Sequence, residues 1–338
     1  MNNFVTMKYT DNSLNILTAK SFKGIGNAWI VKNLRGNEDV ETIVSLLNRT
    51  IKGEQTNIDE FVDLKNDFET KLVHKFEECC DGFVALGDSN FPQHRGNVKE
   101  SERPVFLYYK GNIDLLSINN KNISVIGLLN PEGDIEERER KIVAQFVKNG
   151  ATIVSGLAFG CDSISHQQAL DSNGNTVAIL PSPLNNILPA KNRGLAYKIV
   201  EEGGLIVTEY GNDFKNQMEL SSRYKERDRL QALFCDTIVL AASYAQNSAE
   251  RWKKFGQKLD SGARLAMGYA KEYNIPRAVM YDQSLDENNP MFDLNRDLIS
   301  EQKDIAIITQ DNFRETVMGI MQKNPTGKMP TGVQTKMF

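Results

Sequence analysis

The sequence predicts an α/β fold, a Rossmann-like and mainly parallel sheet with helices on both faces, preceded by a small helical N-terminal domain. Short apolar runs of strand type recur from about residue 122 onward, and amphipathic helical patterns separate them. Continuous apolar strands that alternate with helices are typical of βαβ units, whose parallel sheet is buried on both faces. The first 80 residues follow a helical pattern instead.

The individual elements follow from these patterns in chain order. Strand-like runs lie at 82–87, 104–111, 123–127, 151–155, 175–180, 204–210, 236–242, 277–282 and 304–309. Helical patterns lie at 134–149, 162–172, 192–202, 223–234 and 261–273. The polar stretch 247–260 is interpreted as an insertion between a strand and the next helix.

Length and composition indicate a soluble protein with a sizeable core. A chain of 338 residues favours two domains. We expect a helical N-terminal domain at 1–80, a Rossmann-fold domain at 81–322 and a flexible tail at 323–338. Hydrophobic residues make up 40% and charged residues 25%, as in ordinary soluble proteins. No apolar run reaches the roughly 18–20 residues of a membrane span, and the polar N-terminus does not resemble a signal peptide. We therefore expect a cytoplasmic location and no membrane partner.

Cysteine and histidine are scarce. The chain holds four cysteines, two of them adjacent (Cys79 and Cys80), and three histidines. Adjacent cysteines do not have the spacing of metal ligands, so we expect no zinc site, no cofactor and reduced thiols. The net charge of −4 argues against binding polyanions over the whole surface, although a local basic patch can still bind nucleic acid.

The stretch Ala151–Leu170 holds the most informative motif. It predicts a buried strand, a turn with glycines at 156 and 160, and a helix that begins near Asp162. Glycine allows a sharp turn and a close approach of ligand. Free amides at a helix start suit a phosphate, and ligands of open α/β sheets bind at the carboxyl ends of strands. The sequence therefore predicts an anion site at this turn.

Two side chains of this stretch each have two interpretations. Asp162 suits the N-cap of the helix, and it could also bind a ribose hydroxyl. His166 lies about one turn later, and it can face the ligand or fill the helix–sheet interface. Ser155 and His166 do not form a hydrolase site, because the G-x-S-x-G pattern is absent.

Cations gather on two predicted helices near this turn. They are Lys191, Arg193 and Lys198 on one helix and Arg223, Lys225, Arg227 and Arg229 on the other. On a helix, residues four apart share a face, so the second group forms two cationic pairs. These side chains could contact phosphates, with an affinity that depends on salt. They could equally pair with Glu219, Glu226 and Asp228 on a solvated face.

Two further segments remain open between a nucleic-acid role and a structural role. The turn Lys23–Asn27 is similar to a helix-hairpin-helix, whose amides can hold a DNA phosphate, and to a plain connection between helices. The insertion 247–260 interleaves basic residues with Trp252 and Phe255. That pattern can grip a single strand, and it also fits a solvated helix with one apolar side.

The order of motifs resembles the DNA processing protein A (DprA/Smf) family, within a wider Rossmann-like group that includes the cytokinin-activating lysine decarboxylase-like enzymes. The resemblance covers about Asp88 to Tyr281. The most specific motif is Ser155–Asp162 followed by Ser165-His166, where the family has S-G-L-A-x-G-I-D and A-H. The other matches are Asp88-Ser89-Asn90-Phe91-Pro92, Pro104–Asn112, Val125-Ile126-Gly127, Pro189-Ala190-Lys191-Asn192, Arg227-Asp228-Arg229 and Ser261-Gly262-Ala263.

Departures from the family pattern indicate a divergent paralogue. The family's G-S-R after the first parallel strand is Gly127-Leu128-Leu129 here, so one arginine is missing. The asparagine of R-N-R is Asp228, which places a carboxylate where a DNA backbone could pass.

The resemblance implies a non-catalytic protein that binds single-stranded DNA and helps to load a RecA-type recombinase, as a homodimer. A variant of this function is the DprA-like member of a phage-defence or toxin–antitoxin pair. The alternative is a nucleotide sensor or nucleotide-processing enzyme, although the P-G-G-x-G-T-x-x-E motif of the related enzymes is absent from 259–264. The residues expected to contact DNA or phosphate are Gly127, Ser155, Gly156, Ala158, Gly160, Asp162, His166, Lys191, Asn192, Arg223, Arg227, Arg229, Ser261, Gly262 and Arg264.

Overall fold

A computed structural model describes residues 7–52, 55–254, 256, 259 and 262–323. Within these residues nine strands form one sheet, in the order β1-β2-β6-β5-β4-β3-β7-β8-β9. Their bounds are β1 (Gly82–Ala85), β2 (Phe106–Gly111), β3 (Asn122–Ile126), β4 (Thr152–Ser155), β5 (Thr176–Ile179), β6 (Leu205–Thr208), β7 (Thr237–Leu240), β8 (Arg277–Met280) and β9 (Ala306–Ile308). Strands β3 to β9 pair in parallel, whereas β2 pairs antiparallel with both β1 and β6.

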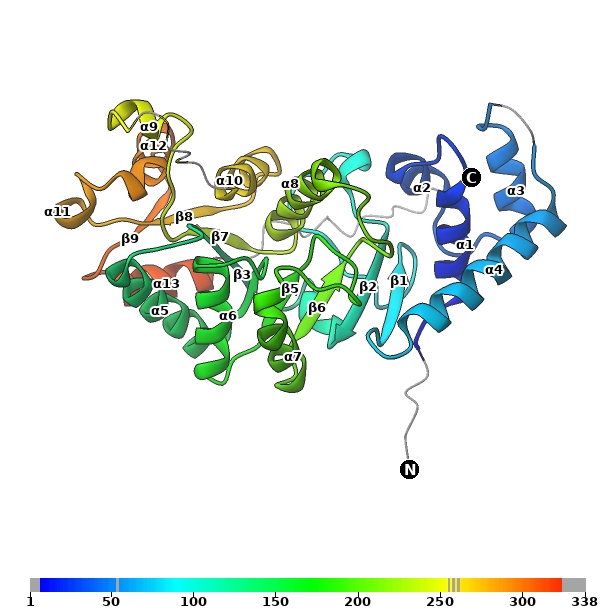
Figure 1. Ribbon diagram of the computed structural model, residues 1–338, viewed down its shortest axis with the longest axis horizontal. Coiled ribbons are helices and arrows are strands. Elements are labelled where there is room, and N and C mark those ends of the chain that lie inside the picture. The colour runs from blue at the N-terminus through cyan, green and yellow to red at the C-terminus, as the bar shows by residue number, and fades with distance from the viewer. Residues whose placement is uncertain (1–6, 53–54, 255, 257–258, 260–261, 324–338) are drawn as a thin grey trace, which may run out of the picture.

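Helices cover both faces of this sheet, which confirms the predicted fold class (Figure 1). Four of them line one face: α5 (Gly133–Lys148), α6 (Cys161–Asp171), α7 (Arg193–Glu201) and α13 (Phe313–Gln322). The other face carries α8 (Gln217–Leu233), α10 (Ala263–Glu272) and α12 (Asp293–Glu301). The short elements are α9 (Ser248–Arg251), α11 (Gln283–Asp286), η1 (Glu100–Glu102), η2 (Ile113–Leu116), η3 (Ala190–Asn192) and η4 (Pro290–Phe292). Strands β3 to β8 are buried along their length, as their apolar sequences predict, whereas the edge strand β9 is half-buried at Ala306 and Ile307.

The N-terminal helices lie at the β1 end of the sheet (Figure 1). They are α1 (Asp11–Ser21), α2 (Asn27–Asn33), α3 (Val40–Asn48) and α4 (Ile58–Phe76). One apolar cluster runs from Ile30 and Phe61 of these helices to Phe83 of β1 and Phe106 of β2. The helices thus share a core with the sheet, and the boundary expected near residue 80 stays a prediction.

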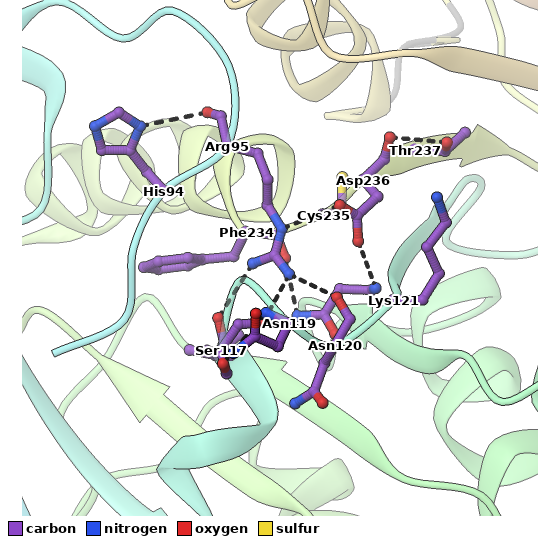
Figure 2. A network of polar contacts seen from close by, with 12 residues as sticks. His94, Arg95, Ser117, Asn119, Asn120, Lys121, Phe234, Cys235, Asp236 and Thr237 are labelled. Carbon is purple, nitrogen blue, oxygen red and sulfur yellow. Dashed lines mark hydrogen bonds and ion pairs between the residues drawn. The ribbon is translucent and has the colours of Figure 1, made fainter. Parts of the chain in front are cut away.

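A buried arginine connects the segment before the parallel strands to the sheet (Figure 2). Arg95 is fully buried, and its guanidinium donates to the carbonyl oxygens of Leu116, Ser117 and Asn120 at 3.0–3.1 Å. Its Nε lies 3.4 Å from Oδ1 of Asp236, whose other oxygen accepts from the amide of Asn122. Arg95 therefore holds the turn before β3 against the start of β7. The sequence carried no signal for this role.

The order of the sheet reverses between β3 and β7. The chain winds outward from β3 through β4, β5 and β6, and then returns to add β7 on the other side. Ligands of open α/β sheets bind at such a switch point, outside the carboxyl ends of the strands. The glycine turn after β4 lies at this edge, next to the segment that follows β3.

Candidate nucleic-acid interface

The glycine turn, residues 155–160, is held by hydrogen bonds to the side chain of Asp162. Helix α6 begins at Cys161 with Gly160 as its N-cap, so the interpretation of Asp162 as the N-cap is wrong. Asp162 lies one position inside the helix, and its Oδ2 accepts from the amides of Gly156 at 3.2 Å and Ala158 at 3.3 Å. Burial raises the pKa of this carboxyl. Two amides that were expected to hold a phosphate are thus already occupied by a side chain of the protein.

Gly156 provides room for an arginine of α8. A Cβ at this position would lie 1.1 Å from Nη1 of Arg227. The guanidinium is buried, with Nη1 3.5 Å from Asp162 and Nε 3.5 Å from Asp228. Neither Nε nor Nη1 has a hydrogen-bond acceptor within the described part of the chain. The absence of a side chain at Gly156 is therefore explained by Arg227 rather than by a ligand.

Asp228 belongs to the same buried cluster. It is buried on α8, and burial raises its pKa to about 7. The expectation that Asp228 places a negative charge in the path of DNA is wrong, because the carboxyl faces inward to Arg227. Gly262 lies beside it, since a Cβ there would be 3.5 Å from Oδ2 of Asp228. The structure thus brings Gly156, Asp162, Arg227, Asp228 and Gly262 together.

Ser155 and His166 are fully buried. The hydroxyl of Ser155 donates to the carbonyl oxygen of Val125 at 2.7 Å. Nδ1 of His166 lies 2.6 Å from Oγ1 of Thr176, which itself donates to the carbonyl oxygen of Ile153. His166 is therefore the donor to Thr176, and burial lowers its pKa to about 3. Of its two interpretations, the structure favours filling of the helix–sheet interface, and neither residue has a surface for DNA.

Gly127 and Gly160 allow the backbone segments of this edge to approach closely. A Cβ at Gly127 would lie 2.5 Å from Sγ of Cys161, and one at Gly160 would lie 2.2 Å from the carbonyl oxygen of Leu128. Gly160 also has a φ of +69°, which favours glycine. Both glycines seat the start of α6 against the segment after β3.

The two outer arginines of α8 are engaged in internal pairs. Nη2 of Arg223 lies 2.7 Å from Glu219, and the guanidinium also donates to the carbonyl oxygens of Asn212 and Asp213. Nη2 of Arg229 lies 2.8 Å from both oxygens of Glu209. Both arginines are buried. The expectation that Arg223, Arg227 and Arg229 line a cationic face for DNA does not fit these positions, because the polar contacts of all three point into the protein.

Lys191 and Arg193 are the predicted cations that reach the surface beside the glycine turn. Both are exposed, and neither forms an ion pair with any residue that the structure describes. Asn192 lies between them and donates to the carbonyl oxygens of Leu157 at 2.8 Å and Ala158 at 3.1 Å. These two hydrogen bonds fix the start of α7 against the turn. Lys198 lies near the other end of α7, 4.0 Å from Asp171.

The remaining predicted segments are placed as follows. Arg264 is half-buried, and its Nε has no acceptor among the described residues. Ser261 lies outside the described residues.

In the insertion, Arg251 pairs with Asp297 and Trp252 donates to Asp293, so both are held against α12. Phe255 and Lys258 lie outside the described residues. The turn at 23–27 joins α1 to α2, with Gly24 at a φ of +89°. Its two interpretations stay predictions.

A buried carboxyl next to this site was missed by the sequence interpretation. Glu139 of α5 is buried, and Oε1 accepts from the hydroxyl of Ser165 at 2.6 Å. Its other oxygen has no partner among the described residues. Burial raises the pKa of Glu139 to about 8. Glu139 stands in the charged run 136–141 of α5, and nothing in that local pattern signals a buried carboxyl.

Replacing Glu139 by glutamine should flatten the dependence of stability on pH. The folded protein keeps a proton on Glu139 that the unfolded chain loses above its ordinary pKa of about 4.5. The free energy of unfolding should therefore fall between pH 5 and pH 8, by about 2–4 kcal/mol from this group. Glutamine cannot ionise, so E139Q should lose less stability over this range. Urea unfolding at pH 5 and pH 8 measures the difference.

Other buried groups do not confound this comparison. Asp228 has a raised pKa, so it also lowers the free energy of unfolding as the pH rises. His166 has a lowered pKa, so it lowers the free energy of unfolding as the pH falls through about 6.5. Both groups remain in E139Q, so their contributions cancel when variant and wild type are compared at each pH. Parallel pH profiles of the two proteins would contradict a neutral, buried Glu139.

Two sequence comparisons identify the family. A sequence model described as DNA recombination-mediator protein A matches residues 82–249. Protein Smf of Borreliella burgdorferi is 30% identical over 229 residues, which is 65% of this chain and 71% of that protein. The chain belongs to the DNA processing protein A (DprA/Smf) family. The predicted resemblance is confirmed.

Other members of the DprA/Smf family match shorter shares of their own length. Protein Smf of Synechocystis sp. is 27% identical over 258 residues, 76% of this chain and 57% of that protein. DNA processing protein DprA of Streptococcus pneumoniae is 31% identical over 140 residues, 41% of this chain and 47% of that protein. The chain therefore aligns with about half the length of these two relatives.

Solved DprA structures share the fold. The crystal structure of DprA from Streptococcus pneumoniae has a TM-score of 0.65 and 22% identity, and the match covers 93% of this chain and 98% of that one. DprA from Helicobacter pylori, described for its single-stranded DNA binding mode, has a TM-score of 0.55 and 22% identity, covering 71% and 95%. At this identity the likeness establishes the architecture alone.

None of the helices that the structure describes has both the length and the apolar character that a membrane crossing requires. No group of three or more histidine, cysteine, aspartate or glutamate side chains in the described part of the chain is arranged to hold a metal ion.

Proposed function

We propose that this DNA-processing family member binds single-stranded DNA across the carboxyl edge of its sheet, without catalysis. The observation that carries the proposal is the pair of exposed cations, Lys191 and Arg193, that Asn192 fixes beside the glycine turn. Unpaired cations on a rigid support suit phosphates, because binding does not first break an ion pair. A solved structural neighbour is described as binding single-stranded DNA, which agrees with this ligand.

The proposed interface is smaller than the predicted one. Lys191, Asn192 and Arg193 lie at its surface, together with the backbone near Ala158. Arg227 and Asp162 act beneath it as positioning residues, because they hold the turn in shape. Arg223 and Arg229 anchor the segment between β6 and α8.

Reversing both surface cations should weaken DNA binding. We expect K191E/R193E to bind a fluorescein-labelled oligo-dT at least tenfold more weakly at low salt. The slope of log affinity against log salt should fall in magnitude by about 1–2, because each phosphate contact on a single strand contributes about 0.7. Fluorescence anisotropy over a series of salt concentrations measures both quantities.

A matched control places the same charge change at the opposite edge of the sheet. Lys148 ends α5 and Lys303 precedes β9, so both lie at the amino edge, and both are exposed. K148E/K303E should retain the affinity and salt slope of the wild type. Equal losses in the two double variants would indicate a general charge effect, and an unchanged K191E/R193E would remove this edge from the interface.

The finer roles stay predictions. They are loading of a RecA-type recombinase, homodimer formation and membership of a phage-defence or toxin–antitoxin pair. The alternative, a nucleotide sensor or nucleotide-processing enzyme, is distinguished by the same assay. Nucleoside monophosphates that bind while oligo-dT does not, or that release free base on incubation, would favour it.

A further inference from the structure

Two large apolar side chains are exposed beside the glycine turn. Leu129 follows β3 and is 52% exposed, and Phe159 lies in the turn after β4 and is 40% exposed. Large apolar side chains of this chain are otherwise mostly buried in three core clusters. Two exposed ones on neighbouring loops of one sheet edge therefore call for an explanation.

The backbone brings the two positions together. A Cβ on Gly160 would lie 2.5 Å from the carbonyl carbon and oxygen of Leu129, and the amide of Cys161 donates to the carbonyl oxygen of Leu128 at 2.9 Å. Gly160 directly follows Phe159 in the chain. The turn after β4 thus lies against the segment after β3, at the edge where the strand order reverses next to β3.

The exposed cations adjoin the same turn. The carbonyl oxygen of Ala158, one residue before Phe159, accepts from Asn192. Lys191 and Arg193 flank Asn192, and both are exposed. An apolar pair and a cationic pair are therefore connected by one short, anchored turn.

This combination of groups matches the two parts of a nucleotide. Cations attract the phosphate, and an aromatic ring with an aliphatic neighbour offers a surface for the face of a base. A phosphate-only ligand would leave Leu129 and Phe159 in water, whereas a purely apolar ligand would not use the cations. A base carried on a phosphate backbone satisfies both.

We propose that Leu129 and Phe159 form a stacking platform for a base of the bound strand, next to the phosphates that Lys191 and Arg193 contact. This inference rests on the proposed function and assigns the base-binding part of that site. Because every base has a π-face, the platform is tolerant of sequence. It predicts that the protein distinguishes a strand with bases from the same backbone without them.

The test compares oligo-dT with an abasic phosphodiester backbone of equal length, both labelled with fluorescein. The wild type should bind oligo-dT about tenfold more tightly, as stacking of one base allows. F159A should lose most of this preference by weakening oligo-dT binding, while its affinity for the abasic strand stays that of the wild type. F159L keeps an apolar surface without the ring and should be intermediate. L129A should lower the preference by a smaller factor.

Met318 on α13 provides the matched control, because it is also a large exposed apolar side chain. M318A should retain the wild-type preference for oligo-dT. All variants should have the same thermal unfolding midpoint as the wild type. An F159A variant that keeps the preference, or that loses both ligands equally, would overturn the platform. A wild type that binds both strands equally would also overturn it while leaving DNA binding in place. A wild type that binds neither strand would instead contradict the proposed function.

Discussion

Replacing Arg95 by methionine should lower the free energy of unfolding by about 3–5 kcal/mol, the largest effect that we expect from a single substitution. The guanidinium is fully buried, donates hydrogen bonds to three carbonyl oxygens and forms an ion pair with Asp236. Methionine fills much of the volume but leaves the Asp236 carboxylate without its buried counter-charge and the carbonyls without donors. Urea unfolding followed by circular dichroism measures the change.

Two controls separate this network from a general effect of losing a positive charge. R95K keeps the charge, but one ammonium group cannot reproduce the planar fork of arginine, so it should also be clearly destabilised. Arg49 is exposed, with no side-chain hydrogen bond or ion pair among the described residues, and R49M should stay within about 0.5 kcal/mol of the wild type. A loss below about 1 kcal/mol for R95M would show that the network contributes little to stability.

Replacing Gly156 by alanine should cost about 2–4 kcal/mol of stability, although it adds only one methyl group. The new Cβ would lie 1.1 Å from Nη1 of Arg227, so the guanidinium must leave. Asp162 and Asp228 would then lose their shared counter-charge in a buried position. Thermal and urea unfolding of G156A measure the loss.

A double-mutant cycle tests whether Arg227 causes this loss. R227A removes the side chain that the methyl group would meet, so G156A should cost much less in that background. Gly194, near the start of α7, is the matched glycine, because a Cβ there would meet no atom within 4 Å. G194A should be neutral or slightly stabilising. Equal costs of G156A with and without Arg227 would place the strain elsewhere in the turn.

The regular elements were predictable because their signals are local. A short apolar run such as 236–242 between helical patterns favours a buried strand, and all nine predicted runs contain a strand. The glycine turn was predictable for the same reason, since Gly156 and Gly160 stand between a strand and a helix. The family motif at Ser155–Asp162 then pointed to this turn as the place of the proposed site.

The chemistry of the site was harder to predict, because a charged residue looks the same in the sequence whether it faces water or a partner. Arg229 pairs with Glu209, which is 20 residues away, and Arg95 pairs with Asp236, which is 141 residues away. Helical spacing alone placed Arg229 on a cationic face. No local pattern shows that the carboxylate of Asp162 turns back to the amides of Gly156 and Ala158.

By itself, the sequence determined the layers of this protein, its family and the turn at which we propose its site, because periodicity, glycines and motifs act over a few residues. Only the tertiary structure decided which of the charged groups remain available to a ligand. Burial forces charges to find partners wherever the chain brings them. Arg227 of α8 therefore supports the turn from within, and Lys191 and Arg193 remain at its surface.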